Sequence, residues 1–260
     1  MIVATWNINS VRLRLPTLLD YLRQVDPDVL CLQELKCQDD QFPRAEIEDA
    51  GYNVLVHGQK SWNGVAILSK RPLEEARRGL PGADEDIQSR YIEALVPDGA
   101  GAVVRIASIY LPNGNPAGTE KTVYKYAFMD RLHTHARELL ALEEKLVLAG
   151  DFNVIPEPQD VYDPGAWTGD ALFMPETRRR WRALVNLGFT DALRATTDAP
   201  KMYTFWDYTG GAWQRNNGLR IDHLLLSPQA ADRLSSVAID KDMRAKEKPS
   251  DHVPIRIELR

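Results

Sequence analysis

The stretch Leu146-Val-Leu-Ala-Gly-Asp151-Phe-Asn153-Val154 combines an apolar run with two polar side chains two residues apart. A short apolar run that ends at a glycine is typical of a strand buried on both faces, although periodicity alone would also fit a buried helix. Because side chains alternate along a strand, Asp151 and Asn153 would point the same way at its carboxyl end. Such a pair can share a metal ion, a water or a phosphate, whereas Asp-x-Asn can also simply open a turn.

We expect six apolar segments to form strands. Each of these segments ends with one or two polar side chains. Taken singly, each polar group is explained by turn chemistry, capping or surface polarity. The repetition of one pattern on six strand ends instead favours a shared functional site. The residues concerned are Asn7, Glu34, Tyr110, Asp151 with Asn153, Asp222, and Asp251 with His252.

Apolar runs and turn signals predict many short strands, separated by both turns and helices. Regular strand–helix alternation is missing, and no glycine-rich phosphate loop follows any strand. We therefore predict an α/β fold, a four-layered sandwich in which two packed, mixed and mainly antiparallel sheets are flanked by helices. The absence of repeats, low-complexity segments and linkers favours a single domain over residues 1–260. Strands are expected at 2–9, 29–32, 52–57, 64–69, 91–96, 103–111, 146–154, 202–208, 220–226 and 253–259, helices at 15–25, 122–143 and 175–187, and loops at 70–90 and 155–173.

Composition excludes several classes of protein. No stretch approaches the ~18 apolar residues of a membrane span, and the amino-terminal residues lack the pattern of a signal peptide. Two cysteines, Cys31 and Cys37, do not make a disulfide framework, so we expect reduced thiols and a cytoplasmic protein, by default a monomer. The net charge of −5 argues mildly against binding nucleic acid through bulk positive charge, but it leaves room for a local basic face.

The residue types at the predicted strand ends suit phosphate chemistry. Hard divalent cations such as Mg²⁺ bind carboxylate and amide oxygens together with waters and substrate phosphate. Hydrolysis of a phosphodiester requires a deprotonated water, a polarised nonbridging oxygen and a stabilised leaving oxygen. A carboxylate base, an amide donor, a histidine and a metal ion together cover these tasks.

Seven motifs make this interpretation specific. They are Trp-Asn7-Ile-Asn9-Ser-Val-Arg, Leu-Gln-Glu34-Leu-Lys, His-Gly-Gln-Lys-Ser-Trp-Asn63-Gly64-Val-Ala-Ile, Tyr110-Leu-Pro-Asn113, Gly-Asp151-Phe-Asn153, Gly-Leu-Arg-Ile-Asp222 and Lys-Pro-Ser-Asp251-His252-Val-Pro. In this order, across residues 2–257, they resemble the signatures of the exonuclease III family. Members of that family are bacterial DNA-repair enzymes that cut beside abasic sites and also degrade duplex DNA from 3′ ends.

The resemblance implies a Mg²⁺-dependent phosphodiesterase, with Mn²⁺ as a substitute metal. Its substrate would be double-stranded DNA with abasic or 3′-blocked sites. It would cut 5′ to an abasic site and leave a 3′-hydroxyl. The resemblance is also compatible with 3′→5′ exonuclease activity and with 3′-phosphatase or phosphodiesterase activity. The implied metal ligands are Glu34 as the principal one, helped by Asn7 and Asp251, with Asp151 and Asn153 at a second metal position.

The resemblance also implies chemical roles. Asp151 would be the acid/base residue for the attacking water, although His252 as the base remains an alternative. Asn153 would orient the water and the scissile phosphate, Tyr110 and His252 would hold phosphate oxygens, and Asp222 would favour the imidazolium form of His252. The implied DNA contacts are Asn113, Arg12, Lys36, Arg90, Lys121, Lys125 and Arg215, and the implied pocket for the abasic sugar consists of Phe205, Leu219 and Trp206.

Two alternatives compete with this interpretation, and the second belongs to a different functional class. Another hydrolase of the wider endonuclease/exonuclease/phosphatase group, acting on phosphoinositides, sphingolipid or nonspecific DNA, would share the catalytic core but differ in the segments between the motifs. A noncatalytic DNA-binding or scaffold protein on the same fold would be expected to have lost Glu34, Asp151 or His252. All three are present. The motif contexts therefore favour the repair branch.

Overall fold

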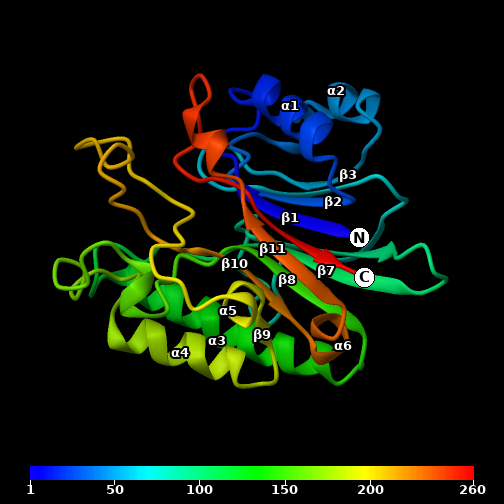
Figure 1. Ribbon diagram of the computed structural model, residues 1–260. Helices are drawn as coiled ribbons and strands as arrows, with labels where there is room; N and C mark the ends of the chain where they lie inside the picture. Colours follow the sequence, from blue (N-terminus) through cyan, green and yellow to red (C-terminus); the bar gives the residue numbers. More distant parts are fainter.

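Two six-stranded sheets packed face to face form the centre of the computed structural model, which describes residues 1–260 (Figure 1). The first sheet has the order β11 (Leu234–Ile239), β12 (Ile255–Leu259), β1 (Ile2–Asn7), β2 (Val29–Gln33), β4 (Val65–Ser69) and β3 (Asn53–His57). The second has the order β5 (Glu74–Arg78), β6 (Tyr91–Pro97), β7 (Val103–Tyr110), β8 (Lys145–Asp151), β10 (Asp222–Leu226) and β9 (Thr190–Asp191).

Helices cover the outer face of each sheet. In Figure 1, α1 (Leu15–Val25) and α2 (Arg44–Asp49) lie over the first sheet, and α3 (Glu120–Leu140) and α4 (Pro175–Val185) lie over the second. Only β1–β2 and β7–β8 pair in parallel, so both sheets are mixed and mainly antiparallel. The predicted four-layered sandwich is confirmed. The remaining short helices are α5 (Ala192–Thr196) and α6 (Pro228–Ala231), and no helix is long and apolar enough to cross a bilayer.

The apolar clusters explain why the central strands are apolar on both faces. Along β8, Val147 and Ala149 join the cluster between the two sheets, whereas Leu146 and Leu148 join the cluster beneath α3 and α4. Successive side chains of a strand point to opposite faces, so a strand in the middle of four layers has no solvent-facing position. The stretch that begins at Leu146 is therefore a strand, as predicted, and this strand ends at Asp151.

Two predictions of secondary structure were wrong. Residues 74–78, expected to lie in a loop, form the edge strand β5; all five are exposed, so the segment has no apolar alternation to reveal it. Residues 202–208, expected to form a strand, contribute only isolated bridges, from Phe205 to Leu219 and to His252. The small elements α2, α5, α6, β9 and β11 were not predicted, because each is short or only partly buried.

A buried carboxylate ties β6 to the helix layer above it. Glu93 accepts hydrogen bonds from Tyr91 Oη (2.6 Å), Arg105 (2.5 Å) and His135 Nε2 (3.0 Å). Burial alone would raise the pKa of Glu93, but the hydrogen bonds from His135, Tyr91 and Arg105 outweigh it and lower the pKa to about 2. The ionised carboxylate therefore stabilises the fold.

We expect Glu93→Gln to lower the free energy of unfolding by about 3 kcal/mol at pH 7, because a buried charge pair loses one partner. A depressed folded-state pKa adds stability above the unfolded-state pKa of about 4.3, and that stability is lost as the pH falls towards 2. The difference in the free energy of unfolding between wild type and Glu93→Gln should consequently become smaller below about pH 4. Urea denaturation at pH 7, 4 and 3 measures it, and a difference independent of pH over this range would contradict the assignment.

Candidate active site

The predicted site residues meet at one end of the two packed sheets. Asn7, Tyr110 and Asp151 end β1, β7 and β8, and Glu34 directly follows β2. Asp222 instead begins β10, and Asp251 and His252 precede β12, so the expectation that all six groups stand at the ends of strands was wrong. Because β10 runs antiparallel to β8 and β12 antiparallel to β1, these amino-terminal ends still lie at the same edge.

Asp151 lies at the junction between the sheets. It is 1% exposed; its Oδ1 accepts the backbone N–H of Asn153 (2.9 Å) and its Oδ2 accepts Asn7 Nδ2 (3.0 Å). The same Nδ2 donates to Glu34 Oε1 (2.9 Å), and Asn7 Oδ1 accepts the backbone N–H of Asn9 (3.1 Å). In this arrangement Asn7 turns its amino group, not its oxygen, towards the carboxylates. It bridges Asp151 and Glu34, and its role as a metal ligand stays a prediction.

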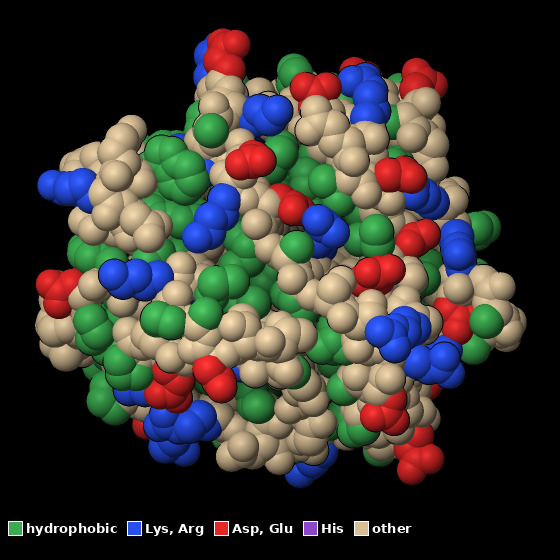
Figure 2. All heavy atoms as spheres, in the orientation of Figure 1, with side chains coloured by type: hydrophobic (Ala, Val, Ile, Leu, Met, Phe, Trp, Pro, Cys, Tyr) green, Lys and Arg blue, Asp and Glu red, His purple; other side chains and the backbone are tan.

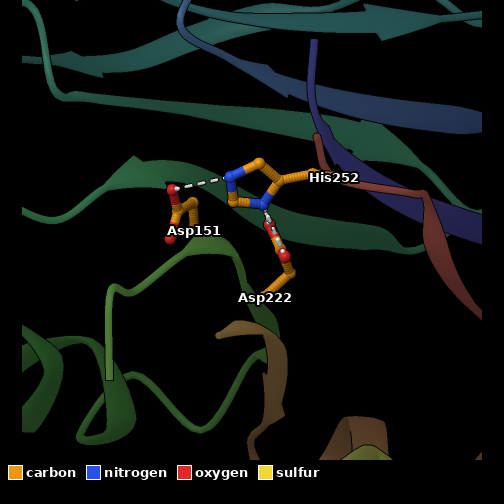
Figure 3. A group of neighbouring side chains, drawn as sticks. All are labelled: Asp151, Asp222 and His252. Atoms are coloured by element: carbon orange, nitrogen blue, oxygen red, sulfur yellow. Dashed lines mark hydrogen bonds and ion pairs between the residues drawn. The ribbon is translucent and has the colours of Figure 1, made fainter. Parts of the chain in front are cut away.

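His252 lies between two aspartates (Figure 3). Its Nδ1 is 2.8 Å from Asp222 Oδ2 and its Nε2 is 3.8 Å from Asp151 Oδ2, while Thr204 Oγ1 donates to Asp222 (2.6 Å). Burial alone would lower the pKa of His252, but the charges of Asp222 and Asp151 outweigh it and raise that pKa. Burial raises the pKa of Asp151, and the nearby His252 opposes that rise. The geometry supports the predicted pairing of Asp222 with His252.

Glu34 is partly exposed, whereas Asp151 and Asp222 are buried. Glu34 Oε1 also accepts Tyr110 Oη (2.8 Å), and its Oε2 forms an ion pair with Lys36 (3.1 Å). Glu34, Lys36 and Asn153 all have left-handed backbone conformations, with φ of +52°, +54° and +47°. Such conformations are costly for residues other than glycine, and they concentrate where surrounding contacts hold a functional side chain in place.

A cavity of about 500 Å³ is bordered by six of the predicted site residues, namely Glu34, Tyr110, Asp151, Asn153, Asp251 and His252. Glu34, Asp151, Asn153 and Asp251 bring oxygen donors to its wall, which is the donor set that a hard divalent cation requires. The cluster of Asp151, Asp222 and His252, whose ligand atoms lie within 4.8 Å of one another, is less suited, because a ligating histidine must be neutral and both nitrogens of His252 already face carboxylates. A metal ion therefore fits the oxygen-rich wall.

The predicted sugar pocket is present in part. Phe205 and Leu219 border the cavity, and the rings of Phe205 and His252 lie 4.9 Å apart. Trp206 points away: it is fully buried, packs against Trp213 and donates its Nε1–H to Asn216 (3.1 Å). Neighbouring residues in extended backbone face opposite ways, so only Phe205 of this pair can reach the cavity.

Most of the predicted DNA contacts are accessible. Arg90 stacks on the ring of Tyr110 (4.8 Å), and Lys121 and Asn113 border a second cavity of about 580 Å³ beside the first. Arg12 and Arg215 are exposed, Arg215 donating to the carbonyl of Gly210, and Lys36 is half-buried. Figure 2 shows acidic and basic side chains interspersed over the face in view rather than a continuous basic patch.

Comparison with known proteins identifies the protein's class. The model of the endonuclease/exonuclease/phosphatase family matches residues 4–252. The chain belongs to this family. Exodeoxyribonuclease III of Haemophilus influenzae is 34% identical over 267 residues, covering 98% of each chain. The structure of the 3′ phosphatase NExo from Neisseria, bound to product DNA hairpin, matches with a TM-score of 0.96 and 39% identity over 100% of this chain and 99% of that chain.

An AP endonuclease from Archaeoglobus fulgidus matches with a TM-score of 0.94 and 35% identity, again over 100% of this chain and 99% of that chain. These relatives confirm the resemblance to the exonuclease III family. Within the endonuclease/exonuclease/phosphatase family, the chain is therefore a metal-dependent DNA-repair nuclease that hydrolyses phosphodiester bonds.

Several residues that support the site of this nuclease were given no role from the sequence. Thr204 holds Asp222, and Asn9 donates to Asp251 Oδ1 (2.8 Å) while accepting Lys36 Nζ (2.6 Å). Asn9 was part of the first motif, two residues after Asn7, but no contact was predicted for it. Thr204 lies in a segment whose irregular backbone gives no periodic signal.

Lys125 is not an accessible DNA contact, which corrects its predicted role. It is fully buried beneath the site, and its Nζ donates to the carbonyls of Asn113 (3.1 Å) and Asn153 (2.6 Å). Burial lowers the pKa of Lys125 to about 7. Its stem packs so closely on Gly114 that a Cβ there would come within 2.6 Å of Lys125 Cδ. Lys125 thus fixes the two polypeptide segments that carry Asn113 and Asn153.

We expect Lys125→Met to lower kcat for DNA cleavage by about 10–100-fold in a protein that remains folded, because displacing a reacting group by about 1 Å can cost ~10²-fold. Steady-state kinetics with circular dichroism measure the effect. Lys70→Met, which removes an ion pair with the Asp26 carboxylate and a hydrogen bond to the Asp26 carbonyl outside both cavities, is the control. A kcat within twofold of wild type in Lys125→Met would show that the two segments hold their position without it.

Proposed function

We propose that this nuclease hydrolyses the phosphodiester 5′ to abasic sites in double-stranded DNA and leaves a 3′-hydroxyl. The observation that carries the proposal is the placement of Asp151, Glu34 and His252 beside a cavity bordered by Phe205 and Leu219. Groups for phosphate chemistry therefore lie next to an apolar pocket that could receive an extrahelical sugar. The archaeal relative described as an AP endonuclease supports the same substrate.

Each residue has a task in the proposed reaction. Asp151 takes a proton from the attacking water, and Asn153, whose Nδ2 donates to the carbonyl of Leu111 (2.9 Å), orients that water and the scissile phosphate. Tyr110 and His252 hold phosphate oxygens; the latter is suited to this because Asp222 favours its charged form. Their hydrogen bonds oppose the negative charge that develops on the phosphate.

We propose Mg²⁺ as the metal, with Mn²⁺ as a substitute. Glu34 would be its principal ligand and Asp251 a second, while Asp151 and Asn153 would offer another position. The oxygen donors on the cavity wall support this choice. When bound, the ion would act as a Lewis acid that polarises the phosphate and stabilises the leaving oxygen.

The proposal is tested with a labelled duplex that contains one stable abasic-site analogue. We expect incision of the labelled strand with Mg²⁺ and none with EDTA. A duplex that stays intact with folded protein and Mg²⁺ would contradict the proposal. It would then favour the alternative of a phosphoesterase or nonspecific nuclease that uses the same groups.

Lys121 offers a test of the DNA-binding surface, because it is exposed and borders the second cavity. We expect Lys121→Ala to weaken duplex binding and to reduce the slope of log affinity against log salt by about 0.9, the value for one lost phosphate contact. Fluorescence anisotropy in EDTA at several salt concentrations measures the slope. An unchanged slope would remove Lys121 from the interface.

We further propose that residues 1–260 act as one domain and as a monomer. The site supports a single domain, because it draws on both sheets and is joined across them by the hydrogen bond between Asn7 and Asp151. The free, buried thiols of Cys31 and Cys37 support a reducing compartment such as the cytoplasm.

A further inference from the structure

A polar cavity, here called the α3 cavity, lies between α3 and the segment that joins β5 to β6. It has a volume of about 370 Å³, and none of its lining residues borders either of the two cavities described above. Its lining includes His135 and Glu138 from α3, and Pro81 and Gly82 from the joining segment. The proposed reaction at the catalytic groups uses none of these residues.

The imidazole of His135 is held from one side by strand β6. The residue is 6% exposed, and its ring meets the ring of Tyr91 edge to face, with centroids 5.6 Å apart. Its Nε2 lies 3.0 Å from the carboxylate of Glu93, which is ionised at neutral pH. Because an ionised carboxylate can only accept hydrogen bonds, Nε2 carries the ring hydrogen. In the neutral imidazole the free lone pair is therefore on Nδ1.

The Nδ1 atom of His135 is buried and has no hydrogen-bond partner. The carboxylate oxygen that faces it, Glu138 Oε2, is 3.9 Å away, which is too far for a hydrogen bond. Buried polar atoms in folded proteins nearly always have a partner, because an unpaired one costs free energy. The nitrogen is therefore expected to bind a group that the polypeptide does not supply.

The spacing of His135 Nδ1 and Glu138 Oε2 suits two ligands of one metal ion. Zinc lies about 2.0–2.1 Å from a histidine nitrogen and about 2.0–2.2 Å from a carboxylate oxygen, so one ion reaches both atoms when they are up to about 4.2 Å apart. The two residues are three apart on α3, which places them on one face of the helix. The side chain of Glu138 is 65% exposed and is thus free to adjust its position.

The surrounding charges leave Glu138 available for a cation. Both carboxylate oxygens of Asp130 accept Arg180 (2.9 and 3.2 Å), and the guanidinium of Arg131 is paired with Asp86. Apart from the imidazole, Glu138 has no ionic partner. The positive charge nearest to the cavity is therefore compensated, whereas one carboxylate is not.

We propose that His135 and Glu138 form a binding site for a divalent transition metal ion, with Zn²⁺ as its representative. A nitrogen ligand favours such ions over Mg²⁺, which prefers oxygen. A metal-binding histidine usually donates its other ring N–H to a carboxylate, as His135 does to Glu93. Permanent structural zinc sites have four protein ligands, so two ligands completed by water make this a reversible site. Its occupation would reinforce the contact of α3 with β6.

The test measures Zn²⁺ binding to the whole protein by calorimetric titration in excess Mg²⁺, which occupies the oxygen-rich wall of the catalytic cavity. We expect Glu138→Gln to weaken the binding of one Zn²⁺ by about 10-fold or more, since the loss of a residue that merely supports a metal ligand already costs about 10–100-fold. Glu120→Gln, at another exposed acid of α3 that lies outside the α3 cavity, should leave the affinity within about twofold of wild type.

Nitrogen-15 NMR of the histidine rings shows where the ion binds. We expect Zn²⁺ to shift the Nδ1 resonance of His135 in the wild type, and expect its Nε2 to keep the proton that is shared with Glu93. An Nδ1 resonance that Zn²⁺ leaves unchanged would overturn the inference, as would a Zn²⁺ affinity that is equal in Glu138→Gln and wild type. Neither readout depends on DNA cleavage, so a failure of the proposed function would leave this test intact.

Discussion

Replacing Asp151 with asparagine is expected to lower the rate of DNA cleavage by about 10²–10⁴-fold while the protein stays folded, because that is the usual contribution of a general acid or base. The structure gives the carboxylate this role. It is buried, it receives N–H groups from Asn153 and Asn7 on its two oxygens, and it lies 3.8 Å from His252 Nε2. An asparagine keeps the shape but cannot take a proton from water. Its amino group would also face N–H donors.

Single-turnover cleavage of an abasic duplex measures the loss, and circular dichroism and thermal unfolding check the fold. The matched control is Asp232→Asn, because Asp232 is exposed and lies at the end of α6, outside the cavity. Near-normal turnover in Asp151→Asn would refute the assigned role and make His252 the stronger candidate for the base.

Replacing Glu34 with glutamine should raise the Mg²⁺ concentration for half-maximal activity by about 10–100-fold or more, and lower the activity at saturating metal. Losing a residue that hydrogen-bonds to a metal ligand already lowers metal affinity or activity by about 10–100-fold, and Glu34 is the proposed ligand itself. In the structure its carboxylate is shared by Asn7, Tyr110 and Lys36, all of which donate to it. A glutamine would present an amino group to at least one of these donors.

Titration of activity with Mg²⁺ gives the midpoint, and calorimetric titration of the protein with Mn²⁺ gives a readout that does not depend on turnover. Glu46→Gln is the control, since Glu46 is an exposed acid on α2. If the midpoint and the heat of metal binding were unchanged in Glu34→Gln, the metal would have to be held elsewhere on the cavity wall.

The sequence predicted those parts of the fold that depend on burial. The strand that ends at Asp151 is apolar from Leu146 to Ala149 because both of its faces are covered there, and the polar residues that follow such runs were therefore conspicuous. The strand β5 was not predicted because it lacks such burial. An exposed, charged edge strand has no buried face, so its pairing is determined by its neighbour β6 and not by its own pattern.

The site was predictable at the level of residue types but not of orientation. Lys125 is basic, and lysines are almost never fully buried, so the sequence favoured a DNA contact. In the structure, Lys125 is instead buried and donates hydrogen bonds to backbone carbonyl groups. Phe205 and Trp206 are adjacent aromatics, and only the backbone conformation decides which of them borders the cavity. The orientation of Asn7 likewise depends on the backbone of Asn9, which turns back towards it.

The most direct test of the central claim is to map the ends produced from a duplex that contains one abasic analogue. The account predicts a single Mg²⁺-dependent cut on the 5′ side of the analogue, and a 3′-hydroxyl that a DNA polymerase extends without further treatment. A cut on the 3′ side, or a 3′ end that the polymerase cannot extend, would contradict it.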